Sequence, residues 1–257
     1  MTITVDGPLP GPFRWSIVVS EHRDGFALDD ALTHALREID DHENADDRIQ
    51  LWIRHVDDEA DTIAAALGFR RYRDLWQLRC ALPNRDSGLV TRAVTPDDLD
   101  DFIAVNNRAF HWHPEQGGLT RAAVEATMQE PWFDPDGFRL LHEGDELVGF
   151  CWTKVHRDTD PNLGEIYVIA IDPSRHGKGL GKPMTLAGLA WLADEGLEHG
   201  MLYVESDNDP ANATYAAIGF SRRCLAIWHS ASAMMTLSPF SEEVSASFTR
   251  LRILPTL

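Results

Sequence analysis

The sequence predicts a mixed α/β protein built from two related units, and three observations lead to this prediction. Segments typical of strands and of helices alternate through most of the 257 residues. A shift of 151 residues aligns 51–71 with 202–222 without a gap. The composition, with 44% hydrophobic and 25% charged residues, is that of a globular protein and excludes disordered and collagen-like chains.

Charge and cysteine content exclude further classes. The net charge of −18 makes nucleic acid and anionic membranes poor partners. No run of roughly 18 apolar residues occurs, and the first twelve residues lack the basic and apolar parts of a secretory signal, so a cytoplasmic protein is expected. Cys80, Cys151 and Cys224 lie far apart, which indicates reduced thiols. His111 and His113 lack a third ligand at a suitable spacing, so no metal is predicted.

The first unit, residues 1–82, reads as half a domain. At the same offset of 151, residues 14–20 match the strand 165–171, and the first unit has no counterpart of residues 89–164. The polar, turn-rich stretch 83–88 then predicts a linker.

The second unit, residues 89–237, reads as a complete domain, and the tail 238–257 shows no clear pattern. Thr95 and Pro96 suit the start of a helix, and Gly219 suits the end of one. The elements expected, in order, are a short apolar run 89–94, helices 95–107 and 120–129, hairpin strands 137–142 and 146–155, a buried strand 164–171, a helix 181–198, a strand 201–205, a helix 209–219 and two strands from 221 onward.

A glycine-rich loop, residues 172–181, joins the buried strand to the next helix. Alternate glycines at 177, 179 and 181 let backbone N–H groups approach a ligand, and the helix N-terminus adds free donors, so the segment suits a pyrophosphate. The local positive charge is expected from Arg175, His176, Lys178 and Lys182. A tight turn with solvated basic residues remains the alternative, and a dinucleotide-binding fingerprint or a P-loop fits less well.

This loop, together with Asn208, Tyr215 and Gly219-Phe220, resembles the motifs of the GNAT N-acetyltransferase superfamily. His176 departs from the Gln or Arg that usually begins the loop. The resemblance implies the GNAT fold and acetyl-CoA as cosubstrate. It implies that acetyl-CoA contacts Ile169, Ala170, Ile171, His176, Gly177, Lys178, Gly179, Leu180, Gly181, Lys182, Asn208, Asp209, Pro210, Ala211, Asn212 and Ala213.

Five further segments resemble a branch of this superfamily that carries two GNAT units in tandem and acetylates the cysteinyl amine of a glucosamine–inositol compound in the last step of mycothiol biosynthesis. They are 105–110, 113–118, 132–137, 152–156 and 202–208. The resemblance implies that the substrate is held by Glu115, Lys154, Glu165 and Tyr203. The alternatives are that Glu115 and Lys154 are solvated and that Tyr203 only packs.

Two residues are predicted to carry the chemistry. Glu165 is a carboxylate on an apolar strand, which favours a general base for the substrate amine over a paired structural acid. Tyr215 is expected to protonate the departing thiolate, with a packed aromatic as the alternative. The resemblance also implies that the N–H groups of residues 169–171, where the strand should splay, polarise the thioester carbonyl.

The first unit is expected to be catalytically inactive and structural. Its residues at the places of Glu165, Gly179, Gly181 and Tyr215 are Arg14, Leu28, Asp30 and Ala64. The whole chain is therefore predicted to transfer acetyl directly to a small molecule, most simply as a monomer. Acetylation of another small amine, or a catalytically dead protein that binds acyl-CoA, are the alternatives.

Overall fold

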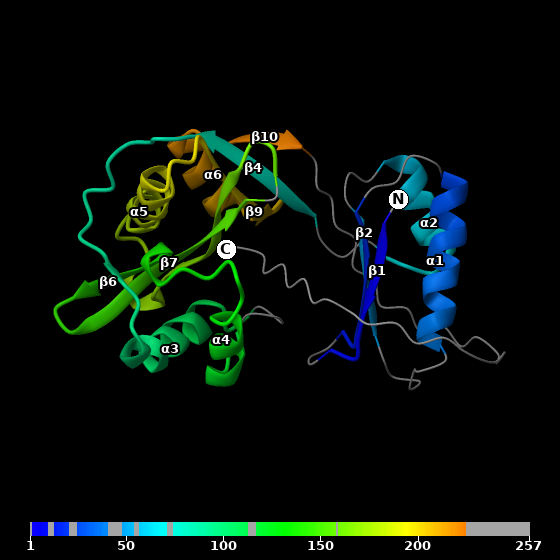
Figure 1. Ribbon diagram of the computed structural model, residues 1–257, viewed down its shortest axis with the longest axis horizontal. Helices are drawn as coiled ribbons and strands as arrows, with labels where there is room; N and C mark the ends of the chain where they lie inside the picture. The colour runs from blue at the N-terminus through cyan, green and yellow to red at the C-terminus, as the bar shows by residue number, and fades with distance from the viewer. Residues whose placement is uncertain are drawn as a thin grey trace. The chain divides into compact units, whose positions relative to one another are not determined.

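The computed structural model describes residues 2–9, 13–20, 25–40, 48–53, 57–70, 74–112, 117–157 and 159–224. Within these ranges the chain forms two compact units that divide between Trp76 and Gln77 (Figure 1). Both units mix helices with strands, as the sequence predicts. Among the residues described, no helix is long and apolar enough to cross a membrane.

The first unit contains a three-stranded sheet with the strand order β1-β2-β3. β1 is antiparallel to β2, and β2 is parallel to β3. Asp57 caps the second helix, since its Oδ1 accepts a hydrogen bond of 2.8 Å from the N–H of Ala60. The elements are β1 (Ile3–Asp6), β2 (Trp15–Val19), α1 (Gly25–Asp40), β3 (Ile49–Ile53) and α2 (Asp58–Ala66).

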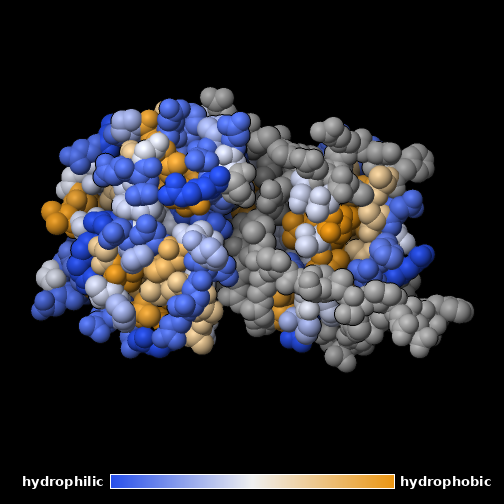
Figure 2. All heavy atoms as spheres, viewed as in Figure 1, coloured by the Kyte–Doolittle hydropathy of each residue, from blue (hydrophilic) through white to orange (hydrophobic). Residues whose placement is uncertain are grey.

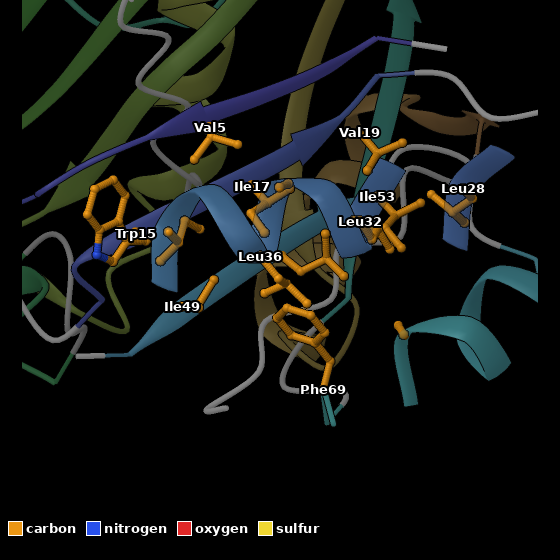
Figure 3. Packing of buried hydrophobic residues seen from close by; sticks show 14 of the residues in the cluster. Val5, Trp15, Ile17, Val19, Leu28, Leu32, Leu36, Ile49, Ile53 and Phe69 are labelled. Carbon is orange, nitrogen blue, oxygen red and sulfur yellow. The ribbon is translucent and has the colours of Figure 1, made fainter. Parts of the chain in front are cut away.

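The core of this unit lies between α1 and the sheet (Figure 3). Leu28, Leu32 and Leu36 recur every four residues, so they share one face of α1. That face meets Ile17 and Ile53 of the sheet, and all five side chains are buried. Burial of each contributes roughly 2 kcal/mol of hydrophobic stabilisation.

The internal repeat is visible in the positions of the elements. At the offset of 151, β2, β3 and α2 coincide with β8 (Leu163–Ile171), β9 (His199–Glu205) and α6 (Asp209–Ile218). α1 breaks the correspondence, because it begins at the residue equivalent to position 176. Leu28, at the place of Gly179, is therefore a core residue of a helix, and no glycine loop exists at this place in the first unit.

The second unit contains a seven-stranded sheet with the order β10-β4-β9-β8-β7-β6-β5. Its remaining elements are β4 (Leu75–Ala81), β5 (Arg92–Ala93), α3 (Leu99–Ala109), α4 (Arg121–Thr127), β6 (Phe138–Glu143), β7 (Glu146–His156), α5 (Gly181–Asp194) and β10 (Ser221–Cys224), with single 3-10 turns at Pro96–Asp98, Pro135–Gly137 and Pro173–Arg175.

The sheet includes one strand that precedes the expected linker. β4 lies between β9 and β10, so the second sheet draws on residues before position 83. Residues 83–88 form no helix or strand. They are fastened to the end of α6, where Asn84 Nδ2 and Arg85 Nη2 donate to the carbonyls of Ile218 and Ala217 at 3.4 and 3.0 Å.

Several element boundaries differ from the sequence-based expectation. The apolar run 89–94 yields only the two-residue strand β5. The helix expected over 181–198 ends at Asp194, because Gly196 adopts a left-handed φ of 79° and β9 begins at His199. β1 was not expected at all. Residues 225–257, including one of the strands expected after 221, lie outside the described residues.

Helices cover both faces of the second sheet (Figure 1). On one face, the Phe102 ring of α3 meets Phe138 and Phe150 edge-on, with centroids 4.8 and 4.7 Å apart. On the other face, a Cβ placed on Gly188 of α5 would lie 2.4 Å from Cys151 Sγ. Neighbouring residues of a strand point to opposite faces, so Phe150 and Cys151 define an α3 face and an α5 face.

The face of the second unit that Figure 2 shows is mainly hydrophilic, with separate small hydrophobic patches. Among the residues described, the large hydrophobic side chains that are exposed are Val90 and Trp112. The charged residues therefore lie mainly on the surface, around a core of buried hydrophobic residues.

Candidate active site

The two central strands of the second sheet part from each other. β8 pairs with β7 along its whole length, from Leu163 to Ile171. Its parallel pairing with β9 covers only two positions, Gly164–Gly200 and Glu165–Met201, in the part of the chain that the structure describes. The β7–β8 register also skips Tyr167, which forms a β-bulge there. Beyond Glu165, the edge of β8 is therefore open toward β9.

Two backbone N–H groups of β8 point into this opening. The N–H of Asp172 donates to the Val148 carbonyl of β7 at 2.9 Å. Since N–H directions alternate along a strand, that of Ala170 also faces β7, whereas those of Ile169 and Ile171 face the opening. Of the three residues expected to offer N–H groups here, two are oriented to do so.

The glycine loop presents its backbone at the end of β8. Gly177 and Gly179 have φ values of 77° and 75°, a region that glycine occupies without steric cost. No heavy atom lies within 4 Å of the position a Cβ would take on either residue. α5 begins at Gly181, and its first turn has N–H groups without helical partners. The loop and the helix N-terminus together suit an anionic pyrophosphate.

Asp172 holds the loop at its start. The carboxylate is buried, and its Oδ2 accepts bonds of 2.9 and 2.5 Å from Nε and Nη2 of Arg108 on α3. Its Oδ1 accepts a bond of 2.9 Å from the Ser174 N–H. Burial raises the pKa of Asp172, but the Ser174 bonds and the Arg108 guanidinium outweigh it, so the pKa lies below the ordinary aspartate value.

The basic side chains of the loop are not equally available to a ligand. Arg175 pairs with Glu143 and Glu146 of the β6–β7 hairpin at 2.8 and 2.7 Å. His176 is exposed, and its Nε2 lies 3.0 Å from the Ile171 carbonyl oxygen. Lys178 is exposed. Of the positive charge expected from four residues, that of Arg175 is therefore offset by two carboxylates.

Glu165 lies on the α3 face, beside the opening. It is 4% exposed, and its register partner on β7 is Lys154. Glu165 Oε2 lies 2.7 Å from Nε2 of His156. The Lys154 ammonium lies over the rings of Trp132 and Tyr167, at 4.6 and 5.8 Å from their centroids.

Tyr203 of β9 lies on the same face, because β9 is in register with β8 at Met201. Its hydroxyl accepts a bond of 2.9 Å from Gln77 Nε2 of β4, and Gln77 Oε1 accepts one of 2.9 Å from Arg79 Nε. Sequence reasoning missed Gln77, although the alternating apolar pattern of 75–81 could have identified the strand. His156 and Trp132 were also missed as site residues.

Tyr215 approaches from the opposite face. It lies on α6 and is 1% exposed, and its hydroxyl has no hydrogen-bond partner among the residues described. Burial raises the pKa of the Tyr215 hydroxyl, and the nearby Cys151, a residue of the α5 face, raises it further. The hydroxyl is therefore protonated and is chemically a donor. Glu165 and Tyr215 thus lie on opposite faces of the sheet.

The start of α6 completes the surroundings of the opening. Asn208 Oδ1 accepts from the Ala211 N–H at 3.3 Å, and Asn212 Nδ2 donates to the carbonyls of Glu205 and Ser206 at 3.2 Å each. Asp209 and Pro210 form the first turn, and Ala213 follows. Glu115 lies outside the described residues.

Among the side chains that the structure covers, no group of three or more His, Cys, Asp or Glu residues is arranged to hold a metal ion. Cys80 and Cys151 are free and buried. Burial raises the pKa of Cys80 to about 11 and that of Cys151 further, so both thiols are protonated near neutrality.

Known proteins with similar sequences and structures identify the class of protein to which this fold and loop belong. Residues 104–220 match the Acetyltransferase (GNAT) family. A solved GCN5-related N-acetyltransferase from Sphaerobacter thermophilus superposes with a TM-score of 0.66 at 18% identity, over 85% of this chain and 72% of that one. This likeness establishes the fold.

More similar sequences narrow the class. "Mycothiol acetyltransferase" of Actinosynnema mirum is 46% identical over 68% of this chain and 60% of its own length. The protein of the same name from Catenulispora acidiphila is 39% identical over 83% of this chain and 70% of its own length. This chain belongs to the mycothiol acetyltransferase family of GNAT proteins. It spans about 60% of the length of the first relatives it matches.

Proposed function

We propose that this chain transfers an acetyl group from acetyl-CoA to the cysteinyl amine of a cysteinyl-glucosamine-inositol compound, in the last step of mycothiol biosynthesis. The names of its relatives support the substrate class. The single structural observation that carries the proposal is the parting of β8 from β9 directly after Glu165, with two backbone donors pointing into the opening.

The residues fit acetyl-CoA on two independent observations. The open backbone of Gly177 and Gly179, next to the N-terminus of α5, suits a pyrophosphate. The unpartnered hydroxyl of the buried Tyr215 suits a group that needs a proton donor. When bound, acetyl-CoA supplies the acetyl group as a thioester.

Different residues of the chain then carry out the separate steps of the reaction. Glu165 accepts the proton that the substrate ammonium must lose before nitrogen can attack. The N–H groups of Ile169 and Ile171 donate to the oxygen on which negative charge develops. Tyr215 gives its proton to the sulfur that leaves. The nitrogen loses a second proton as the amide forms, which balances the proton that Tyr215 gives up. Lys154 and Tyr203, on the face of Glu165, hold the sugar–inositol part through hydrogen bonds, and Glu115 is assigned the same role.

We further propose one catalytic site per chain, within the second unit, with no metal and a small molecule as the only obligatory partner. The first unit is structural in this proposal, because a helix replaces the loop at Leu28 and α2 has Ala64 at the place of Tyr215. A monomer in the cytoplasm satisfies these requirements.

A second candidate, acetylation of another small amine, is favoured by one observation. The Lys154 ammonium is engaged by the rings of Trp132 and Tyr167, which reduces what it offers to a polyhydroxyl ligand. A protein that only binds acyl-CoA fits less well, because Glu165 and Tyr215 flank the opening from its two faces.

The test is incubation of the purified chain with acetyl-CoA and the cysteinyl-glucosamine-inositol compound, with products identified by mass spectrometry. We expect one acetyl group on the cysteinyl nitrogen. The matched control is glucosamine-inositol without cysteine, which keeps the sugar amine and should remain unmodified. Acetylation of other small amines but not of the cysteinyl compound would favour the second candidate.

A further inference from the structure

His156 forms a contact with the proposed base that no part of the mechanism above uses. Its Nε2 lies 2.7 Å from Glu165 Oε2. The Glu165 side chain is 5% exposed, whereas that of His156 is 22% exposed. The pair therefore joins a buried carboxylate to a ring that reaches the surface.

The strand register places His156 behind Glu165 as seen from the opening. Lys154 is opposite Glu165, and His156 is opposite Leu163, one step toward the start of β8. The opening lies in the other direction, at Ile169 and Ile171. The ring thus binds the carboxylate on the side away from the place where the thioester is proposed to react.

The hydrogen bond fixes the tautomer of the ring. An ionised carboxylate only accepts hydrogen bonds, so Nε2 carries the proton and donates it. Oε2 is thereby occupied, and Oε1 is the oxygen left for an amine. A buried carboxylate is also more readily kept ionised when a donor satisfies one of its oxygens.

We propose, building on the proposed function, that His156 is a positioning residue: its Nε2–H holds Oε2 of Glu165, so that an ionised Oε1 is presented to the acceptor amine. The ring takes no proton from the substrate. It acts through Glu165, by orienting the carboxylate and keeping it charged.

Other titratable groups share this face and bear on any pH profile. Lys154 of β7 is opposite Glu165, and His199 at the start of β9 follows the register next to Leu163. Tyr203 lies further along β9. All three are unchanged in the variants below, so differences between variants report on His156.

The test compares His156→Phe, which removes the donor, with His156→Gln, which keeps a donor that does not titrate. The matched control is His34→Gln, since His34 pairs with Glu38 at 3.4 Å on the exposed surface of α1. We expect kcat to fall about 10-fold or more in His156→Phe and to recover partly in His156→Gln. The acidic limb of kcat should move to higher pH in His156→Phe alone, with KM for acetyl-CoA unchanged.

A second readout needs no turnover. In the proposal, ¹⁵N NMR of the wild-type His156 ring shows its proton on Nε2, the nitrogen that faces Glu165 Oε2. If the wild-type chain acetylates no amine, the proposed function fails, and the position of this proton still decides the role of His156. A proton on Nδ1 alone, or an unchanged pH profile of kcat in a folded His156→Phe protein, would overturn the inference.

Discussion

Gly179 marks a residue at which the two related units differ in structure. In the second unit its left-handed φ of 75° opens the loop backbone to a ligand. In the first unit the equivalent Leu28 is fully buried in a helix. The repeat therefore has an exposed glycine loop in one copy and a buried helical residue at the same place in the other.

Replacing Gly179 with Asp should abolish tight acetyl-CoA binding. The side chain places a negative charge next to the proposed pyrophosphate, and the positive φ disfavours it. Titration calorimetry should show one site per wild-type chain and at least a 10-fold weaker affinity in the variant. Gly144→Asp is the control, because Gly144 also has a positive φ, of 64°, but lies in the β6–β7 turn. Two sites per chain, or normal binding by Gly179→Asp, would contradict the assignment.

Replacing Tyr215 with Phe should slow turnover with little effect on acetyl-CoA affinity. The hydroxyl makes no hydrogen bond among the described residues, so its removal breaks none of them. Stability should therefore stay the same or increase. Steady-state kinetics and thermal unfolding of the same preparation measure both effects. A variant with full kcat would remove Tyr215 from the mechanism.

At the scale of elements, local signals predicted the parts of the site better than their arrangement. The apolar, β-branched run 164–171 identified β8, and the start at Asp209-Pro210 with the end at Gly219 identified α6, because strand burial and helix ends leave signatures within a few residues. The contact of His156 with Glu165 depends on the register between two strands, which no local pattern encodes.

The position of β4 in the sheet is another feature that local sequence patterns do not encode. Its alternating residues predict a strand, but nothing local indicates that this strand pairs with β9. Gln77 could therefore not be connected with Tyr203 from the sequence. The bulge at Tyr167, where β8 leaves β9, is likewise a product of the assembled sheet.

The ion pair between Arg108 of α3 and Asp172, at the start of the glycine loop, predicts that the stability of the fold depends on pH. The pKa of Asp172 is lowered in the folded state, so its contribution to stability is present above the ordinary aspartate pKa and is lost as pH falls through the folded-state value. Asp172→Asn should lower the free energy of unfolding by about 2 kcal/mol at neutral pH, because it removes the negative charge that accepts two hydrogen bonds from Arg108.

Chemical denaturation of both proteins from pH 7 to pH 3 measures this effect. The difference in unfolding free energy between wild type and Asp172→Asn should shrink below about pH 4. Asp136→Asn is a control, because Asp136 is exposed. A difference that stays constant over this range would show that the Asp172 charge does not stabilise the fold.

At the scale of the whole molecule, the boundary between the units lies before the linker. Because β4 belongs to the second sheet, a fragment of residues 87–257 lacks a strand between β9 and β10, together with the buried Leu78 and Cys80. We expect this fragment to be insoluble or strongly destabilised and inactive. A fragment beginning at Asp74 keeps β4 and should be more stable in thermal unfolding. A stable, fully active 87–257 fragment would show that the N-terminal part is dispensable.

The central claim is that Glu165, buried where β8 leaves β9, removes the proton from the acceptor amine. The most direct test is the rate of acetyl transfer from acetyl-CoA to the cysteinyl-glucosamine-inositol compound by wild type and Glu165→Gln, measured from neutral to high pH. At neutral pH the variant should be slower by roughly 10²-fold or more in kcat, the usual effect of a positioned base. The loss should be partly recovered at high pH, where the amine is already deprotonated. Equal rates at neutral pH would contradict the account.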